Sequence, residues 1–468
     1  MQWLRNSTTI KFLSCVAVGL FIWLLPRPLG VTPEAWKLLA LFVATVLGII
    51  LKPLPMGAVS IIGLTIAVAT NTISLNAACS GFGNDVVWLV VFAFFIAKGF
   101  ISTGLGSRIA YVIMSRLGKN SLGLGYGLIA TDLILAPCIP STTARAGGII
   151  YPILKGLIDV FSGRSHDPRL SAFLALSAFQ GSAVTSAMFL TGMAGNALVL
   201  QIAQSQNITI TWMNWALAGI VPGLLTLLIL PYFLYRLDPP VIQKTPYARE
   251  LALEKLRAMG PMSGKEIIMA SLFVLLLILW IGGQFFGLKP TGAAMIGLSI
   301  LLITKILTWK EVLEEHGAWD TLIWFSTLVT LACQLNSTGL SSWFSQFVVT
   351  YVQGFHWIGG FLILALIYFY THYFFASAVA HIGAFLAPFL LIALALGTPP
   401  LLAALVFGYF SNLFMGLTHY GSGAAPIFFN AGHVSVGQWW KAGALCSILF
   451  VVIWLVVGGV WWKFIGIW

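Results

Sequence analysis

A short polar run between two apolar stretches constrains this chain most. The run 140–148 reads PSTTARAGG, while residues 121–137 and most of 146–160 are apolar. In hydrocarbon, irregular backbone is tolerated only where it is buried in protein or lines a water-filled cavity. We therefore predict a helical hairpin that enters the membrane part-way, with 140–148 as its tip near the middle of the bilayer. The alternative is two complete spans joined by a short surface loop.

The composition indicates a membrane protein. Hydrophobic residues make up 59% of the chain and charged residues only 8%, whereas soluble proteins carry about a quarter charged residues. We predict an all-α polytopic membrane protein with about 11 transmembrane segments, because apolar runs near the length of a span recur along the chain. The five cysteines are scattered and predict no disulfide framework, metal site or cofactor.

The net charge of +11 is explained by orientation. With the N-terminus in the cytoplasm, most lysines and arginines fall on the cytoplasmic side, Arg5 and Arg164 among them. Outside fall only Arg27, Lys37, Lys289 and Lys463, which follows the positive-inside rule. A nucleic-acid partner is therefore not expected. The stretch before the first apolar run predicts neither a cleavable signal nor a transit peptide.

The second half of the chain echoes the first. Asp85 precedes a Ser-Thr-Gly-Leu run at 102–105, and Asp320 precedes the same run at 337–340. Further echoes follow in the same order: Thr191-Gly192 with Thr418, and the tryptophans 212 and 215 with 439 and 440. An odd number of spans before the second copy would place the halves in opposite orientations. This pattern predicts two inverted-topology repeats and alternating access.

The repeat predicts a second hairpin, with limbs 358–376 and 383–397, that enters from the outside. Each hairpin would face a broken span, 172–204 interrupted around 191–196 and 401–430 interrupted around 418–423. Half-helix N-termini favour an anion, and hydroxyls add donors without a permanent charge. The clustering therefore predicts a carboxylate site, although close helix packing is the alternative for any single Ser, Thr or Gly.

Five segments resemble the divalent anion transporter family, the dicarboxylate/sodium symporter-like proteins. They are PSTTARAGG (140–148), AWDTL (318–322), HYFFAS (372–377), LTHYGSG (417–423) and WWKF (461–464). Within the family, the chain is most similar to the plastid-type 2-oxoglutarate/malate translocators and their bacterial relatives. The resemblance implies an elevator mechanism, a homodimer and a multi-pass protein of the bacterial inner membrane.

The resemblance also implies a division of labour along the chain. Scaffold parts would occupy 1–120 and 267–356, hairpin and transport parts 121–237 and 357–468, and a cytoplasmic linker 238–266. By position, the family's substrate-binding residues correspond to Ser141, Thr142, Thr143, Ala380, His381, Ile382, Thr191, Gly192, Asn196, Thr418 and Gly421.

The departures from the family pattern concern sodium. In sodium-coupled members, two motif asparagines help to hold Na⁺, and the corresponding residues here are Thr142 and His381. Hard cations prefer oxygen ligands, and imidazole offers only nitrogen. The resemblance with these departures implies sodium-independent exchange.

Three polar residues near the predicted site keep open roles. Arg145 can pair with Asp132 across the hairpin, contact substrate directly, or lie exposed at the cytoplasmic face. His419, within the second break, is either a ligand or a packing residue.

The predicted function is exchange of dicarboxylates, 2-oxoglutarate for malate or for succinate or fumarate. A sodium- or proton-coupled dicarboxylate or citrate symporter is the first alternative. A channel, a receptor or a membrane enzyme is the second, but the chain carries no motif of a metalloprotease, a phosphate-binding loop or a nucleophile elbow. We therefore expect that the protein is not an enzyme.

Overall fold

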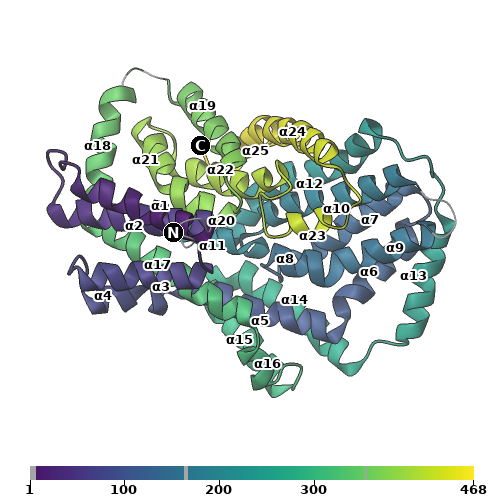
Figure 1. The fold of residues 1–468 in the computed structure, drawn as a ribbon. Coiled ribbons are helices and arrows are strands. Elements are labelled where there is room, and N and C mark those ends of the chain that lie inside the picture. Colours follow the sequence, from purple (N-terminus) through teal and green to yellow (C-terminus); the bar gives the residue numbers. More distant parts are fainter. Residues whose placement is uncertain (1–6, 163–166, 353, 355) are drawn as a thin grey trace. The chain divides into compact units, whose positions relative to one another are not determined.

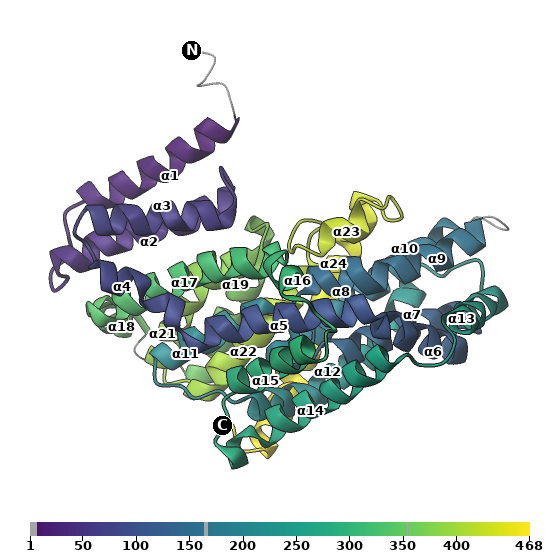
Figure 2. The same cartoon turned by 90° about the horizontal axis from the view of Figure 1, so that it is seen from below.

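The structure, a computed structural model, describes residues 7–162, 167–352, 354 and 356–468 (Figures 1 and 2). Within this part the chain forms helices and turns and no strand, apart from one isolated β-bridge between Asn120 and Lys244. The expected all-α architecture is therefore confirmed. Arg5 and Arg164, two of the cations assigned to the cytoplasmic side, lie outside the described residues.

Eight helical segments of the described chain are long and apolar enough to cross a membrane. Five shorter apolar helices accompany them, at Thr8–Leu24, Met56–Ala69, Ser121–Leu135, Pro290–Ile303 and Pro400–Gly416. The polytopic membrane character is thus confirmed, but by length and composition the described chain has eight candidate spans rather than the expected 11 or so, because several of the apolar runs form helices shorter than a full crossing.

The chain divides into two compact units, each built from parts of both sequence halves. The first unit comprises the described residues of Met1–Val91, with Ala197–Ile210 and His316–Phe407. Its helices are α1 (Ser7–Leu24), α2 (Pro33–Leu51), α3 (Met56–Ala69), α4 (Leu75–Cys79), α17 (His316–Ser337), α18 (Leu340–Val352), α19 (Trp357–Tyr370), α20 (Ala378–His381) and α21 (Ala387–Ala395).

The core of the first unit lies where α2, α3 and α17 meet. Leu38 of α2, Leu64 of α3 and Leu331 of α17 are buried against one another there. Both views show α1, α2 and α3 side by side (Figures 1 and 2). Helix α2 begins where Thr32 caps its first turn and Pro33 occupies the first helical position, where a missing N–H costs nothing.

The second unit comprises Phe92–Asn196, Thr211–Glu315 and Gly408–Trp468. Its helices are α6 (Leu105–Leu117), α7 (Ser121–Leu135), α8 (Thr142–Arg145), α9 (Tyr151–Ser162), α10 (Pro168–Met188), α12 (Trp212–Leu237), α13 (Pro246–Met259), α14 (Gly264–Phe286), α15 (Pro290–Ile303), α16 (Trp309–Leu313), α23 (Ala425–Phe429), α24 (Val436–Val452) and α25 (Gly458–Phe464). Three helices continue from one unit into the other: α5 (Asp85–Thr103), α11 (Ala194–Ser205) and α22 (Pro400–Leu413).

Helix α10 is the centre of the second unit. Every residue from Leu170 to Met188 is buried, so all faces of this helix contact protein. It packs against α7 and α12. Its polar side chains, among them Gln180 and Ser186, therefore have to find partners inside the protein, which ties α10 to the site described below.

The linker predicted at 238–266 contains helix α13, which packs on α6 through Ala248 and Ala252. Arg108 of α6 holds the turn after α13, because its guanidinium pairs with Glu266 at 2.6 Å and donates to the carbonyl of Gly260 at 2.9 Å. The linker is thus folded onto the second unit.

Similar elements occur in the same order in both halves of the chain. Helices α3 and α15 each have 14 residues, and the short helices α4 and α16 that follow them each have five. Helices α6 and α18 each have 13 residues and follow glycines with left-handed backbone, Gly104 (φ 77°) and Gly339 (φ 80°). These glycines lie in the Ser-Thr-Gly-Leu runs, where only glycine adopts such a φ without strain.

Candidate functional site

The first predicted hairpin tip is an interrupted helix in the second unit. Helix α7 ends at Leu135, and Pro137 and Pro140 lie in the segment that follows. Ser141 then caps the four-residue helix α8, its Oγ accepting the N–H of Ala144 at 3.1 Å. A π-helical turn, Ala146–Ile150, leads into α9. Helix starts and π-helical turns both loosen the regular backbone bonding, as is frequent at functional sites.

The tip presents small and polar groups on its open side. Thr143, Gly147 and Gly148 are exposed and Ser141 is half-buried, whereas Thr142 is buried. Thr143 is therefore the hydroxyl of this tip that is most accessible to a ligand.

The second tip has the same local structure in the first unit. Ser377 caps the four-residue helix α20, its Oγ accepting the N–H of Ala380 at 3.3 Å. A π-helical turn, Ile382–Leu386, follows and leads into α21. Each tip therefore consists of a serine cap, four α-helical residues and five π-helical residues.

This local geometry corrects the register in which the two tips were compared. The counterpart of Ser141 is Ser377, so Thr142 and Thr143 correspond to Ala378 and Val379. The comparison made from sequence paired the first motif with Ala380, His381 and Ile382, three positions further on. The caps determine the register, because in both tips the serine hydroxyl accepts the N–H three residues further on.

The three residues predicted at the second tip are buried in this structure. Ala380 is 2% exposed, and His381 and Ile382 are 0% exposed. The His381 ring stacks on Tyr368 with ring centres 4.8 Å apart, and its Nε2 lies 3.1 Å from the hydroxyl of Thr371. His381 occupies the position that Arg145 has in the first tip.

Arg145 is buried inside the first hairpin. Its Nε donates to Asp132 at 3.0 Å, and its other nitrogens donate to the carbonyl of Gly192 at 2.7 Å, to Ser186 Oγ at 2.6 Å and to the carbonyl of Ile139. Arg145 is 0% exposed and Asp132 is 1% exposed. Of the alternatives open from sequence, the structure contains the pair across the hairpin.

The Arg145–Asp132 pair leaves no net charge beneath the tip. Asp132 also accepts a short hydrogen bond from Thr185 of α10, so both of its oxygens are engaged. Buried charges are tolerated when paired and hydrogen-bonded. An anion at the open side of the tip would therefore meet hydroxyl and N–H dipoles rather than a free cation.

The first break is fastened to the first tip. Helix α10 ends at Met188, a 3₁₀ turn spans Leu190–Gly192, and α11 begins at Ala194. Thr191 Oγ1 donates to the carbonyl of Pro137 at 2.5 Å, and the N–H of Ala194 donates to the carbonyl of Pro140 at 2.9 Å. The side chains of Thr191 and Asn196 are both buried. Their observed contacts hold the backbone in place.

The second break meets the same tip. Helix α22 ends at Leu413, and the chain remains irregular or 3₁₀ until α23 begins at Ala425. A Cβ added to Gly423 would lie 2.7 Å from Thr143 Oγ1, so the two backbones approach closely there. Thr418 is buried, and its hydroxyl has no hydrogen-bond partner among the residues that the structure describes.

Two amides that the sequence analysis missed also hold the second break. Gln180 Nε2 donates to the carbonyl of Gly416 at 2.9 Å, and Asn412 Nδ2 donates to Asn196 Oδ1 at 2.7 Å. These two residues could have been found from the sequence, because polar residues inside long apolar runs are costly unless they are paired. His419 is half-buried beside Phe429, and its Nδ1 accepts the indole N–H of Trp440 at 3.2 Å.

The second unit therefore brings together the first tip and both breaks, with Ser141, Thr142, Thr143, Thr191, Gly192, Asn196, Thr418 and Gly421. The second tip belongs to the first unit. Within the described chain, no three His, Cys, Asp or Glu side chains are grouped so that they could hold a metal ion.

Residues 6–468 match the family model described as the sodium:sulfate symporter transmembrane region. The chain is 51% identical to the putative malate transporter YflS of Bacillus subtilis, covering 98% of this chain and 97% of that protein. It is also 51% identical to the chloroplastic dicarboxylate transporter 1 of Arabidopsis thaliana, over 99% of this chain and 84% of the other. The L-tartrate/succinate antiporter of Escherichia coli is 33% identical, over 96% and 97% of the two chains.

Among solved structures, the YdaH transporter of Alcanivorax borkumensis resembles this chain with a TM-score of 0.55. The two are 13% identical, and the match covers 98% of this chain and 97% of the other. At this identity the likeness concerns the fold alone.

Proposed function

Since the chain belongs to the sodium:sulfate symporter transmembrane-region family and its relatives are named as transporters rather than enzymes, we propose that it exchanges dicarboxylates across a bacterial inner membrane. The proposed pair is 2-oxoglutarate and malate, with succinate or fumarate as further counter-substrates. Its relatives include a putative malate transporter and an L-tartrate/succinate antiporter, which supports both the substrate class and the exchange mode.

The observation that carries this proposal is the meeting of the first tip with the second break. Thr143 is exposed where it approaches Gly423, and the first turn of α8 begins beside it. Donors at a helix start, together with hydroxyls, suit a carboxylate. Arg145 is excluded from direct contact in this arrangement, because its guanidinium is consumed by Asp132, Gly192 and Ser186.

Exchange without sodium is proposed from the residues at the two caps. The positions that follow the capping serines are Thr142, a buried hydroxyl, and Ala378, which has no side-chain oxygen. Hard cations need several oxygen ligands, so the second tip offers a poor sodium site. A sodium- or proton-coupled symporter of dicarboxylates or citrate is the alternative.

The mechanism we propose is an elevator movement built on two inverted repeats, in a homodimer with a cytoplasmic N-terminus. The recurrence of α3–α4 as α15–α16 and of the first tip as the second supports the repeat. Scaffold parts would be 1–120 and 267–356, and mobile parts 121–237 and 357–468, joined by the linker 238–266.

Uptake of labelled 2-oxoglutarate into liposomes tests the function directly. We expect uptake when the lumen contains malate, and little uptake when it is empty or contains acetate. Replacing Na⁺ by K⁺ or choline should leave the rate unchanged. Strong uptake into empty liposomes driven by an inward Na⁺ gradient would favour the symporter, and uptake indifferent to every internal anion would contradict exchange.

A further inference from the structure

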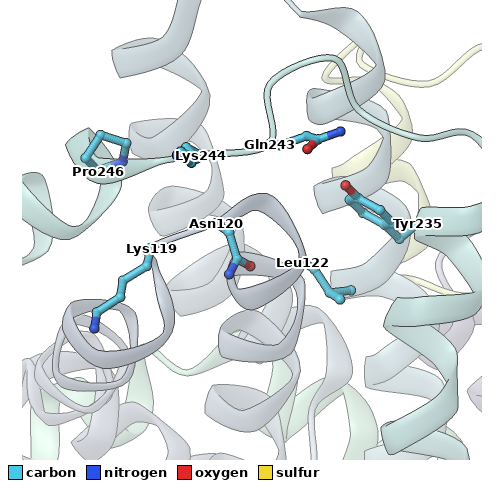
Figure 3. Close-up of a pocket in the computed structure, with 7 residues that line it drawn as sticks. All are labelled: Lys119, Asn120, Leu122, Tyr235, Gln243, Lys244 and Pro246. Carbon is cyan, nitrogen blue, oxygen red and sulfur yellow. The ribbon is translucent and has the colours of Figure 1, made fainter.

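A hollow of about 570 Å³ lies away from the predicted substrate site, where the linker meets the start of the first hairpin. Residues 119–122 form one side and residues 243–246 the other, and Tyr235 of α12 contributes its ring. Figure 3 shows Asn120 and Tyr235 beneath the loop that carries Gln243 and Lys244, with the Lys119 side chain extending away to one side. All of these residues belong to the second unit.

The walls of this hollow are held by the backbone rather than by the side chains that line it. The N–H of Ser121 donates to the carbonyl of Gln243 at 3.0 Å, and the N–H of Thr245 donates to the carbonyl of Lys119 at 3.0 Å. Thr245 Oγ1 also donates to the carbonyl of Gly118 at 3.0 Å. These backbone contacts do not use the ammonium groups of the two lysines or the hydroxyl of Tyr235 that line the hollow.

The lining groups that remain are hydrogen-bond donors with positive charge. No carboxylate of the described chain lies within ion-pair distance of Lys119 or Lys244. The hydroxyl of Tyr235 has no hydrogen-bond partner among the described residues, while its ring packs edge-on against Phe173 at 5.7 Å. The Asn120 side chain uses its oxygen to cap α7, with Gly123 N–H at 2.7 Å, so its NH₂ faces outward as a donor.

Two acidic groups of the segments beside the hollow are already engaged. Asp167 accepts the N–H of Ile242 at 2.8 Å and that of Arg169 at 3.0 Å, and Asp238 pairs with Arg169 at 3.5 Å. The charged residues that line the hollow are Lys119 and Lys244. Lysine ammonium groups on flexible stems bind phosphates as point charges and can turn toward a ligand.

The hollow also lies at the level where a membrane surface is expected. Tyr235 is two residues before the end of α12, a candidate membrane span, and Leu122 is the second residue of the apolar helix α7. Span ends reach the headgroup region, where basic pockets bind anionic lipid headgroups.

We propose that the hollow binds a phosphate-bearing anion, with the headgroup of an anionic phospholipid as its source. Lys119 and Lys244 would neutralise the phosphate, and Tyr235, Asn120 and Gln243 would donate hydrogen bonds to it. A bound headgroup would link the start of the first hairpin to the linker between the sequence halves. This proposal depends on membrane insertion and not on which dicarboxylate is carried.

Thermal unfolding of the purified full chain, with short-chain lipids as probes, tests the site. We expect short-chain phosphatidylglycerol to stabilise the protein and phosphatidylcholine of the same chain length to do so much less. In K119Q/K244Q the apparent dissociation constant for phosphatidylglycerol should rise about thirtyfold, because each of the two lysines near a charged surface contributes about 1 kcal/mol. The matched control K265Q/K441Q removes two exposed lysines elsewhere and should bind as the wild type does.

A second variant and a soluble probe complete the experiment. Y235F removes only the hydroxyl and keeps the contact with Phe173, so it should weaken binding several-fold without changing stability in the absence of lipid. Glycerol phosphate distinguishes the source: stabilisation equal to that by phosphatidylglycerol, and lost in K119Q/K244Q, would assign the site to a soluble phosphate ester. Equal responses to both lipids, or equal losses in the pocket and control pairs, would overturn the proposal.

Discussion

Arg145 and Asp132 form an ion pair of 3.0 Å in which neither side chain is more than 1% exposed. The pair joins α7 to α8, since Asp132 lies on α7 and Arg145 ends α8. Because the two charges neutralise each other, the pair holds the tip in place without adding net charge to its open side.

Removing one partner of this pair should destabilise the protein strongly. Arg145→Ala leaves the Asp132 carboxylate buried without its cation, and such losses typically cost about 3–5 kcal/mol. D132N/R145Q should recover part of the yield of monodisperse protein, measured by size-exclusion chromatography after heating. The control is Arg169→Ala at the exposed pair with Asp238 (3.5 Å), expected to cost about 0–1 kcal/mol. A mild effect of Arg145→Ala would contradict the brace.

Thr143 and Gly423 should behave as a coupled pair in transport. Thr143→Val removes the exposed hydroxyl and should raise KM for 2-oxoglutarate by roughly 10- to 100-fold, since a lost hydrogen bond to a charged group is worth roughly 1.5–3 kcal/mol. Thr143→Ser should keep most activity, and the buried Thr142→Ser should have little effect. Gly423→Ala brings its Cβ to 2.7 Å from Thr143 Oγ1 and should impair exchange by itself.

The double variant T143A/G423A, compared with the single variants T143A and G423A, then tests whether the two residues share one defect. We expect it to be no worse than the more impaired of the single variants, because the close contact disappears with the hydroxyl. Additive losses would show that the two positions act independently.

The register of the second tip predicts which cysteines react. With the exposed Cys79 and the half-buried Cys333 replaced, Val379→Cys should be labelled by a membrane-impermeant maleimide, because Val379 is half-buried, whereas cysteines at Ala380 and His381 should be protected. Thr143→Cys, at the corresponding position of the first tip, is the positive control. Faster labelling at His381 than at Val379 would restore the register first expected from sequence.

Arg108 should hold the turn after α13 in the linker in place. It bonds Glu266 and the carbonyls of Met259, Gly260 and Pro261, so Arg108→Ala should expose this turn to protease. Limited proteolysis should then cut near residue 260 several-fold faster than in the wild type. Arg257→Ala, an exposed arginine on α13, is the matched control and should leave the rate unchanged.

Local chemistry made much of the fold predictable. Long apolar runs predict helices, whose backbone groups bond to one another without water. Prolines followed by a serine, as at 137–141, predict that one helix ends and a new one begins. The interruption near Thr191 was visible because glycine and polar residues lie inside a run too long for one crossing. These features depend on neighbouring residues alone, so they survive into the structure.

Only the tertiary structure decided how these pieces are used. Which serine caps the second tip depends on one hydrogen bond, from Ala380 to Ser377, that the hydrophobic pattern around it does not mark. The partner of Arg145 and the approach of Thr143 to Gly423 depend on packing between segments that are distant in sequence. The sequence by itself determined a helical membrane protein with polar tips and broken spans. The packing around α10 decided which polar groups brace the site and which stay open, because a buried polar group has to find its partner within the fold.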